Sequence, residues 1–448
     1  MYSAQHTIVR EQKHPALFAY LDDNSRLAKK LYNASLYRIR QIFTGWDKKS
    51  RTKNEQEVFD EVKQTEAAYG ITIRRVISYF HLEKLMRATR NPDFFSGLPM
   101  QTAQQVVRLA VQNFNSWLAA VKAYKVSSAG FTGKPRMPHY IRPETAAYIF
   151  TNQDAVCRKD DTLKLPGTKV TLPVSYKKDG WRLKQVNVKP VPGAYDVITV
   201  FEHEDETIVD ASFTESAAID FGVENIAAIV YTDGTSGIYK GGELLSHLQL
   251  YAKRRGKAVA NITYGKKHVG AHSRRLDRMD LDHENYIRDM LHQISRRIVN
   301  DCLKHKVKQL VLGVNKNWKQ ESNLGRVNNQ NFVMIPIGRL RDMITYKAER
   351  AGILVIIQEE SYTSQASFVD GDTIPTYGDK VIPKFSGRRI KRGLYRAVNG
   401  LVLNADCNAA ANILRKALPE EAARIKNFQF LSKPEVMKRS PVKRIAAA

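Results

Sequence analysis

Apolar residues recur at helical spacing over much of the first quarter of the chain. Residues 104–124 carry one apolar stripe along a single helical face, formed by Val107, Val111, Phe114, Leu118 and Val121. Helix-forming residues dominate from 15 to 126, so a helical domain is predicted there. The short alternating segment HTIVR lies within residues 1–14 and predicts a first strand.

Short alternating segments replace this helical pattern from residue 127 onwards. Proline and glycine punctuate residues 127–212, which predicts a small β-rich domain. The next apolar segment ends at Asp220, a second runs through Ile229 and Val230, and a DG turn signal precedes a third. Three such segments in succession predict an antiparallel meander.

Helix and strand signals alternate after the meander. The pattern predicts a helix over about 282–306, a strand over 309–314, a helix that stops at Gly352, the strand ILVII, and a last helix in ADCNAAANILRKA. Three strands followed by alternating helices and strands is the order of an RNase H-like fold. The chain is therefore predicted to be a multidomain α/β protein with an RNase H-like domain.

The net charge of the chain indicates what kind of molecule it binds. The 448 residues carry a formal charge of +26, which implies a large polyanion, and nucleic acid is the first choice. There is no apolar run of ~18 residues and no apolar leader, so we expect a cytoplasmic protein, nucleoid-associated when bound to DNA, without a membrane partner. The cysteines, Cys157, Cys302 and Cys407, form no CxxC pair, which argues against a disulfide framework or a cysteine zinc site.

Two carboxylates stand where metal-dependent phosphodiester hydrolysis needs them. Two divalent cations about 4 Å apart require carboxylate ligands that converge. In the predicted fold, Asp220 ends the central first strand and Asp406 opens the last helix beside it. Each also has a structural explanation, because Asp220 can simply end a strand and Asp406 is a good helix N-cap. Together, on this order of elements, they predict a nuclease site.

Four motifs carry a resemblance to a known family: AIDFGVENIAAIVYTDG, DMLHQISRRIVN, YTSQASF and LNADCNAAANIL. They resemble the RuvC-type nuclease segments of TnpB, the RNA-guided endonucleases of insertion sequences, and of the related type V CRISPR effectors. The resemblance implies an endonuclease that cuts double-stranded DNA with two Mg²⁺ or Mn²⁺ ions and a guide RNA from a transposon end or a CRISPR array. Asp220 and Asp406 match the first and third catalytic, metal-binding carboxylates. We expect a monomer.

The resemblance also implies a division of the chain into functional parts. The guide RNA is expected to lie across a helical recognition domain and a β-barrel wedge domain, beside a short DNA motif that the protein reads. The implied parts are a first wedge strand (1–14), the recognition domain (15–126), the wedge domain (127–212), a RuvC-like nuclease core (213–366), a ribbon-like nucleic-acid-binding insert (367–402), and a last RuvC segment with a basic tail (403–448).

The second carboxylate departs from the family pattern. Most of the family ends the fourth strand with a glutamate, where this chain has Gly313. That strand should lie beside ILVII at about 4.8 Å, so a glutamate that follows ILVII can reach the same cations. Glu359 and Glu360 both follow it, and we favour Glu360, which is nearer the next loop, with Glu359 as the alternative. Glu321 is a weaker substitute because a loop would have to place it.

The zinc ribbon of the family is also altered. Ser367, Asp370, Arg396 and Asn399 stand at the positions of its four cysteines, while the turn glycines Gly371 and Gly400 remain. We therefore expect a zinc-free insert held by turns and packing. A second possible metal pair, His268 and His272, lies within KKHVGAHSRR, where a role against RNA or solvent is the better interpretation.

Basic runs occur throughout the chain and suit a long duplex contacted through its phosphates, with affinity that falls steeply as salt rises. The candidate nucleic-acid-binding residues are Arg38, Lys177, Lys178, Arg182, Lys253, Arg254, Arg255, Lys266, Lys267, Arg388, Arg389, Lys391 and Arg392.

Two other functions fit parts of this pattern. An RNA-guided DNA-binding repressor without nuclease activity would explain Gly313 and the missing cysteines, but not the retention of Asp220 and Asp406. A guide-independent transposase of RNase H-like fold would explain the two aspartates but not the β-rich domain. RNA that copurifies with the protein would separate the transposase from the RNA-guided alternatives.

Overall fold

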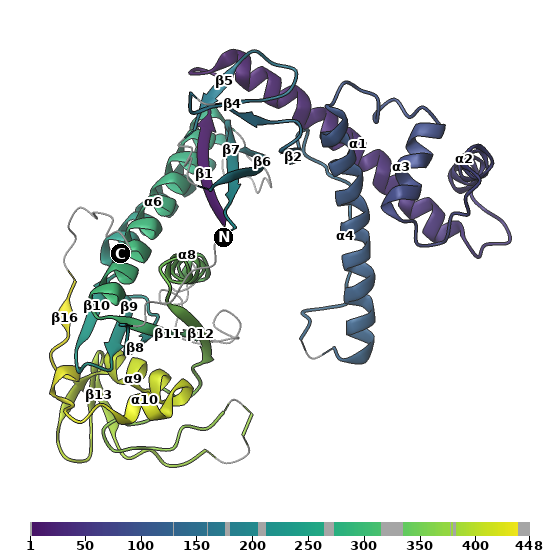
Figure 1. The fold of residues 1–448 in the computed structure, drawn as a ribbon. Coiled ribbons are helices and arrows are strands. Elements are labelled where there is room, and N and C mark those ends of the chain that lie inside the picture. The colour runs from purple at the N-terminus through teal and green to yellow at the C-terminus, as the bar shows by residue number, and fades with distance from the viewer. Residues whose placement is uncertain are drawn as a thin grey trace. The chain divides into compact units, whose positions relative to one another are not determined.

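The chain divides into two compact units, Met1–Asp205 and Glu206–Ala448, and each is treated separately (Figure 1). The structure, a computed structural model, describes residues 2–128, 130–158, 160–174, 180–204, 212–263, 273–314, 335–376, 378–379 and 382–437. Within these residues, no helix is both long enough and apolar enough to cross a membrane.

Four helices occupy the predicted helical segment of the first unit. They are α1 (Pro15–Gly45), α2 (Lys53–Tyr69), α3 (Tyr79–Ala88) and α4 (Met100–Val126). Helix α2 shows why its ends lie where they do: Thr52 and Glu55 form a reciprocal capping box, and Gly70 ends the helix at a positive φ of 60°.

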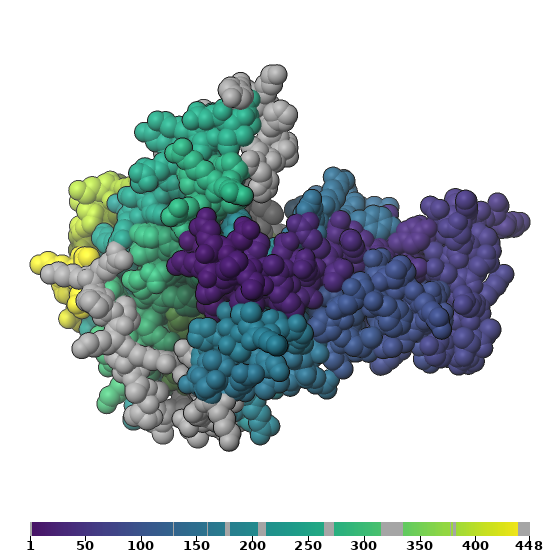
Figure 2. Space-filling model, turned by 90° about the horizontal axis from the view of Figure 1, so that it is seen from above, coloured from purple at the N-terminus to yellow at the C-terminus, as the bar shows by residue number. Residues whose placement is uncertain are grey.

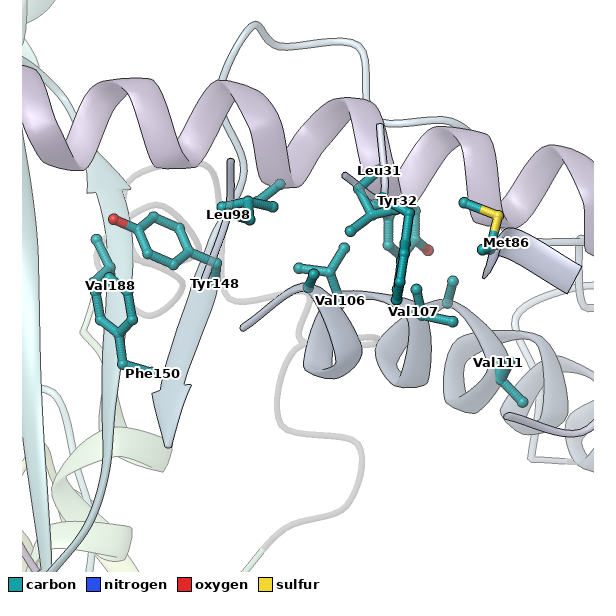
Figure 3. Close-up of a cluster of buried hydrophobic side chains, with 14 of the residues drawn as sticks. Leu31, Tyr32, Met86, Leu98, Val106, Val107, Val111, Tyr148, Phe150 and Val188 are labelled. Carbon is teal, nitrogen blue, oxygen red and sulfur yellow. The ribbon is translucent and has the colours of Figure 1, made fainter. Parts of the chain in front are cut away.

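The predicted stripe of α4 packs against α1. Val107, Val111 and Phe114 are buried, and the longer helix α1 supplies Leu31 and Tyr32 to the same core (Figure 3). In the space-filling view the residues of α1, in purple, lie directly against those of α4, in blue (Figure 2). Burial of this apolar stripe is therefore what holds the helical segment together.

The β-rich segment forms two open sheets. The larger has the order β1-β7-β6-β2, so the first strand of the chain pairs with β7. Its strands are β1 (Tyr2–Val9), β2 (Tyr148–Thr151), β6 (Arg182–Val191) and β7 (Ala194–Glu202). The smaller sheet contains β3 (Val156–Cys157), β4 (Thr162–Lys164) and β5 (Thr171–Pro173). The predicted barrel is wrong as far as the described residues go, because β1 and β2 are unpaired edges of the larger sheet.

A six-stranded sheet of the order β12-β11-β8-β9-β10-β16 forms the centre of the second unit. Strands β8, β9 and β10 form the predicted meander, and β11 and β12 run parallel to β8. This confirms the RNase H-like order. The strands are β8 (Glu215–Asp220), β9 (Asn225–Tyr231), β10 (Ser236–Lys240), β11 (Val307–Val314), β12 (Leu354–Glu359) and β16 (Glu435–Val436).

The C-terminal segment adds a strand that the sequence pattern did not predict. Strand β16 pairs in parallel with β10 and forms the sixth strand of the sheet. The preceding elements are α9 (Ala405–Ala417), α10 (Pro419–Ala423) and the 3-10 turn η1 (Gln429–Leu431).

Helices cover both faces of this sheet. The remaining ones are α5 (Gly242–Thr263), α6 (Arg274–Lys304) and α8 (Ile337–Glu349). Helix α6 begins eight residues before the predicted start at 282, because Ser273 caps it by accepting a hydrogen bond from the Leu276 N–H at 3.1 Å. Its polar first turns concealed the start of the helix from the hydrophobic pattern.

Alternation along β8 assigns its side chains to the two faces. Ala217 and Ile219 pack with α6 and α8, whereas Ala218 packs with α9. Asp220, two residues after Ala218, therefore belongs to the α9 side of the sheet.

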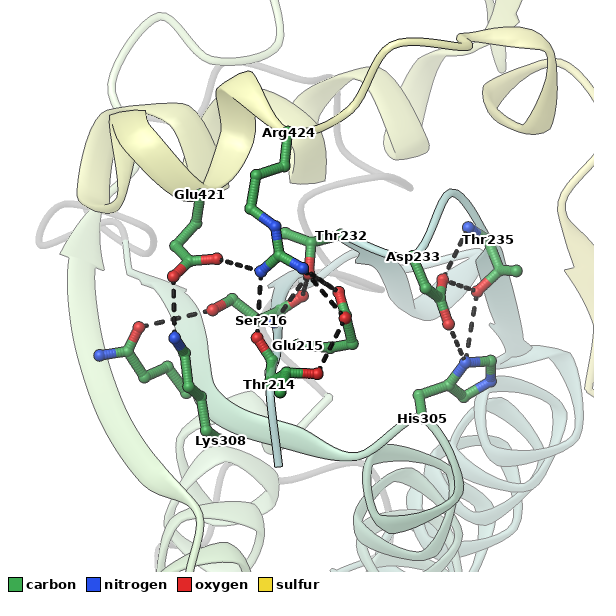
Figure 4. Close-up of polar contacts among 11 residues, drawn as sticks. Thr214, Glu215, Ser216, Thr232, Asp233, Thr235, His305, Lys308, Glu421 and Arg424 are labelled. Atoms are coloured by element: carbon green, nitrogen blue, oxygen red, sulfur yellow. Dashed lines mark hydrogen bonds and ion pairs between the residues drawn. The ribbon is translucent and has the colours of Figure 1, made fainter. Parts of the chain in front are cut away.

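Ion pairs close the opposite end of the sheet (Figure 4). Arg424 of the segment after α10 bonds to Glu215 at 3.1 Å, and Lys308 of β11 bonds to Glu421 at 2.9 Å. Beside them, His305 at the end of α6 lies 2.6 Å from Asp233 in the β9–β10 turn. These contacts fasten α6, α10 and the meander at the end away from Asp220.

The His305–Asp233 pair should make local stability depend on pH. Its hydrogen bond to Asp233 raises the pKa of His305, although burial opposes the shift. Burial opposes ionisation of Asp233, but its hydrogen bonds with His305 and Thr235 hold the pKa of Asp233 below its ordinary value. The pair therefore stabilises fully between about pH 4 and about pH 6.5, and the stabilisation is lost as pH rises through the raised pKa of His305.

We predict that Asp233→Asn speeds amide exchange in the 231–236 turn more at pH 5.5 than at pH 8, relative to wild type at the same pH. The asparagine keeps an acceptor for the Thr235 N–H but removes the charge. Hydrogen exchange with mass spectrometry measures the effect, and an equal effect at both pH values would contradict the titration of this pair.

Candidate nuclease site

The two predicted aspartates lie at one end of the sheet. Asp220 is the last residue of β8, and Asp406 lies in the first turn of α9, which packs against β8. Asn404 caps this helix by accepting hydrogen bonds from the N–H groups of Asp406 and Cys407. The cap and the Ala-rich packing face of α9 thus place Asp406 beside the central strand.

The electrostatic surroundings of Asp220 are those of an acidic cluster. Burial raises the pKa of Asp220 well above its ordinary value, and the negative charges of Glu360 and Asp406 raise it further, while Arg389 opposes them. Glu360 and Asp406 therefore each lie within electrostatic reach of Asp220. Close like charges of this kind attract a cation.

Glu360 occupies the space beside Gly313. Strand β12 pairs with β11 in a register that aligns Val314 with Glu359, and the Glu360 N–H donates to the Val314 carbonyl at 3.2 Å. A Cβ atom at Gly313 would lie only 2.8 Å from Oε2 of Glu360 and 2.6 Å from Cδ1 of Ile413. Glycine at 313 and a carboxyl group from 360 are therefore complementary in space.

One oxygen of the Glu360 carboxyl group is available to bind a ligand. This oxygen, Oε2, is buried and has no hydrogen-bond partner among the residues that the structure describes. Burial raises the pKa of Glu360 to about 7, and the charge of Glu359 adds to the shift. Together with Asp220 and residues 361–365 it lines an open cavity of about 330 Å³. Tyr362 in this turn has a positive φ of 65°, a strained conformation typical of functional sites.

Glu359 is engaged elsewhere. Its carboxylate accepts a hydrogen bond from the Ser361 N–H at 2.6 Å and one from Nζ of Lys416 at 2.7 Å. Burial opposes ionisation of Glu359, but these bonds hold its pKa below the ordinary value. Glu359 is also not among the residues that line the cavity. The two adjacent glutamates therefore have different environments.

Asp406 is held at the side of the cluster. Nδ2 of Asn225 donates to its Oδ2 at 2.6 Å, and the guanidinium of Arg389 lies 3.8 Å from its Oδ1. Across the part of the chain that the structure describes, no three acidic, histidine or cysteine side chains are already gathered tightly enough to hold a metal ion. Asn225 was not singled out from the sequence, because nothing local marks it as a partner of a residue 181 positions away.

The ribbon-like insert contains a hydrogen-bonded junction at the altered positions. Ser367 is fully buried and donates through Oγ to Asp370 at 2.6 Å. Asp370 also accepts from the N–H of Val398 at 3.1 Å, which joins the two predicted knuckles. Gly371 and Gly400 have φ values of 71° and 87°, so both turn glycines are required.

The other two altered positions are exposed. These are Arg396 and Asn399, and Asn399 accepts from the N–H of Leu401. A second carboxylate, Asp372, accepts from the N–H of Ser367 at 2.7 Å and from Ser386. Carboxylates thus bridge segments that are far apart in the insert, whose hairpin is β13 (Arg388–Lys391) and β14 (Leu394–Arg396), followed by β15 (Val402–Asn404).

We predict that Asp370→Ala frees the two knuckles, because it removes the half-buried carboxylate that accepts from both of them and leaves the buried Ser367 hydroxyl without this acceptor, which costs roughly 1–3 kcal/mol. Amide exchange should rise at residues 367–372 and 396–400. Asp379→Ala is the matched control, since Asp379 accepts from the Thr376 N–H within its own exposed turn. Unchanged exchange in the 396–400 peptide of Asp370→Ala would show that packing alone joins the knuckles.

The candidate nucleic-acid-binding residues have varied surroundings. Arg388, Arg389, Lys391 and Arg392 are exposed on the β13–β14 hairpin, and Lys253 and Arg254 are exposed on α5. Five of the described candidates pair with carboxylates: Arg38 with Glu61, Arg182 with Glu204, Arg255 with Asp280, Arg389 with Asp406, and Arg392 with Glu224. Lys177, Lys178, Lys266, Lys267, His268, His272 and Glu321 lie outside the described residues. A contact of any of these residues with nucleic acid stays a prediction.

Comparison with known proteins adds independent observations. Residues 199–319 match a family described as a probable transposase of the OrfB IS605 type, and residues 338–413 match the Cas12f1-like TNB domain. The CRISPR-associated endodeoxyribonuclease Cas12f2 of a Micrarchaeota archaeon (strain CG1_02_47_40) is 25% identical over 237 residues, which are 50% of this chain and 41% of that protein. The chain thus spans less than half the length of this curated relative.

Solved structures are similar over most of the chain. The cryo-EM structure of a Cas12f1–sgRNA–target DNA complex matches with a TM-score of 0.50 and 13% identity, over 90% of this chain and 84% of that chain. A CRISPR-Cas12f ternary complex has a TM-score of 0.34 and 14% identity, over 90% and 83%, and is too dissimilar to support an argument.

The sheet order is that of an RNase H-like fold. The comparisons confirm the resemblance found in the sequence: parts of the chain are similar to the OrfB IS605 type of transposase and to Cas12f proteins.

Proposed function

We propose that this protein is an RNA-guided DNA endonuclease whose nuclease site consists of Asp220, Glu360 and Asp406. The observation that carries the proposal is the pairing of Gly313 with Glu360, whose carboxyl oxygen lies 2.8 Å from where a side chain at 313 would begin. A chain that had merely lost the glutamate at 313 would have no reason to place another carboxyl group in the vacated space. Glu360 thus takes the part of the second carboxylate in this proposal.

The residues at this site suit divalent cations. Two carboxyl groups line one cavity, and a buried carboxyl oxygen lacks a partner among the described residues. Burial and then the neighbouring negative charges raise the pKa of Asp220. Oxygen ligands of this kind are those that Mg²⁺ and Mn²⁺ prefer. When bound, two such ions would activate a water molecule and stabilise the leaving oxygen of a phosphodiester.

The remaining residues have definite tasks in this proposal. Asp220 and Glu360 face the cavity and would hold the cations from the strand side. Asp406 would join them from α9 while Asn225 keeps its carboxylate oriented through Oδ2. Arg389 carries a positive charge beside Asp406, where it can meet a DNA phosphate.

Guide RNA and double-stranded target DNA are the proposed partners. The net charge of +26 supports them, as does the solved Cas12f1 relative, which was captured with a guide RNA and target DNA. In this proposal the exposed arginines of the β13–β14 hairpin bring the DNA backbone to the acidic cluster. We retain the domain division predicted above and a monomeric protein as parts of the proposal.

An RNA-guided DNA-binding repressor is the second candidate. The observation that favours it is the position of Asp406, which is tied to Asn225 and Arg389 rather than gathered with the other two carboxyl groups. The two candidates differ only in whether DNA is cut.

We predict that Asp220→Ala and Glu360→Ala each reduce cleavage to the background rate, because each removes a proposed metal ligand, while RNA binding is retained. Glu359→Ala should reduce cleavage only in part. Glu421→Gln, which alters a carboxylate at the far end of the sheet, is the control. Cleavage of labelled DNA by purified RNA complexes measures the effect, and full activity of both Glu359→Ala and Glu360→Ala would reject the relocated glutamate.

We further predict that the purified protein carries RNA whose sequence directs cutting of a matching DNA library in Mg²⁺. Sequencing of the RNA and of the surviving library reports the guide and the adjacent motif together. Bound RNA without cutting would favour the repressor, and cutting or strand joining without RNA would favour a guide-independent transposase.

A further inference from the structure

Helix α9 carries a polar stripe that faces the segment after β12. Asn408, Asn412 and Lys416 are spaced four residues apart and so share one face of the helix. Asn408 and Asn412 are fully buried, although asparagine is a poor helix former and costly to bury without partners. Buried asparagines inside an Ala-rich helix are explained only if their side chains have hydrogen-bond partners.

Both asparagines bind the backbone of the loop that follows Glu360. Nδ2 of Asn412 donates to the carbonyls of Thr363 and Ala366 at 2.8 and 2.7 Å. Nδ2 of Asn408 donates to the Ala366 carbonyl at 2.8 Å, and its Oδ1 accepts from the N–H of Phe368 at 3.0 Å. The stripe therefore fixes this loop to the helix that carries Asp406.

Lys416 extends the stripe to the two residues on either side of Glu360. Its Nζ lies 2.7 Å from Oε2 of Glu359 and 3.4 Å from the carbonyl of Ser361, and it also donates to the Pro375 carbonyl at 3.2 Å. Only 10% of the Lys416 side chain is exposed, so solvent screens its charge poorly. Lys416 thus restrains the side chain of the residue before Glu360 and the backbone of the residue after it.

We propose that Lys416 is a positioning residue of the nuclease site: by holding Glu359 and Ser361 it directs the intervening Glu360 into the space beside Gly313. The inference rests on the proposed function, since it assigns a partner to the proposed second metal ligand. Lys416 also occupies Glu359 with a cation, which keeps that carboxylate out of the cavity. The same helix thereby positions two metal ligands, Asp406 directly and Glu360 through its neighbours.

The test is Mn²⁺ affinity of the full chain freed of RNA, measured by calorimetry with Asp220→Ala as the blank. We expect Lys416→Met to weaken Mn²⁺ binding about 10-fold, as is usual for the loss of a partner that orients a metal ligand. Lys416→Arg should recover most of the affinity because it keeps the charge and the donors. Lys308→Met is the matched control: it breaks the ion pair with Glu421 at the far end of the same sheet and should leave Mn²⁺ affinity unchanged.

A double-mutant cycle distinguishes positioning from general stability. Glu359→Gln keeps an acceptor for the Ser361 N–H but removes the charge that Lys416 meets. If Lys416 acts through Glu359, the double variant should bind Mn²⁺ no more weakly than Lys416→Met alone. If the losses of Mn²⁺ affinity in the two single variants add up in the double variant, the positioning role is overturned. It is also overturned if Lys416→Met lowers the melting temperature as Lys308→Met does but leaves Mn²⁺ affinity unchanged.

The same data separate this inference from the proposed function. If wild type binds Mn²⁺ no better than Asp220→Ala, the metal site itself fails, and with it the role of Lys416. If wild type binds and Asp220→Ala does not, but Lys416→Met and Glu359→Gln both bind as wild type does, only the positioning role fails. Should Lys416→Met not fold, Lys416→Arg and Glu359→Gln carry the comparison.

Discussion

The packing of α9 against the central strands is the contact on which the second unit depends. Its alanines, together with Ile413 and Leu414, share one apolar cluster with Ala218 of β8 and Val311 of β11. Small side chains on both surfaces let the helix approach the sheet closely. This approach puts Ile413 directly over Gly313, sets Asp406 beside the end of β8, and turns the polar stripe of α9 toward the loop after β12. Core packing and site geometry therefore arise from one interface.

At two places where the sequence departs from the family pattern, the structure has a carboxylate that fills the position. Glu360 fills the space left by the missing side chain at 313, and Asp370 joins two turns at positions where the family has zinc-binding cysteines. The two carboxylates differ in how they are satisfied. Asp370 accepts hydrogen bonds from both turns and is a structural link, whereas Oε2 of Glu360 is buried without a partner among the described residues. A buried oxygen without a hydrogen bond destabilises a fold unless it binds a ligand. Asp370 therefore fits a structural role, and Glu360 fits a binding role.

Charge is distributed in a way that suits a polyanionic substrate near the acidic cluster. Arg389 of the exposed β13–β14 hairpin lies near Asp406, and its positive charge opposes the mutual repulsion of the acids around Asp220. At the opposite end of the sheet, by contrast, the basic and acidic side chains neutralise each other in pairs (Figure 4). One end of the sheet is thus built for stability, and the other leaves charges available for partners.

The sequence alone determined the order of strands β8 to β12 and helices α6, α8 and α9, because the periodicity of apolar residues is a local property that can be read without knowledge of contacts. It did not predict helix α5 or strand β16. The sequence also located Asp220 at the end of a strand and Asp406 at the start of a helix, because the apolar pattern shows where those elements end and begin. The closed barrel and the start of α6 were mispredicted, since strand closure and a polar helix start leave no apolar signal. Only the tertiary structure decided which glutamate enters the space beside Gly313. That outcome depends on the β11–β12 register and on Lys416, which holds Glu359 from 57 residues away. Register and such long-range partners are set by packing between elements, and no single segment encodes them.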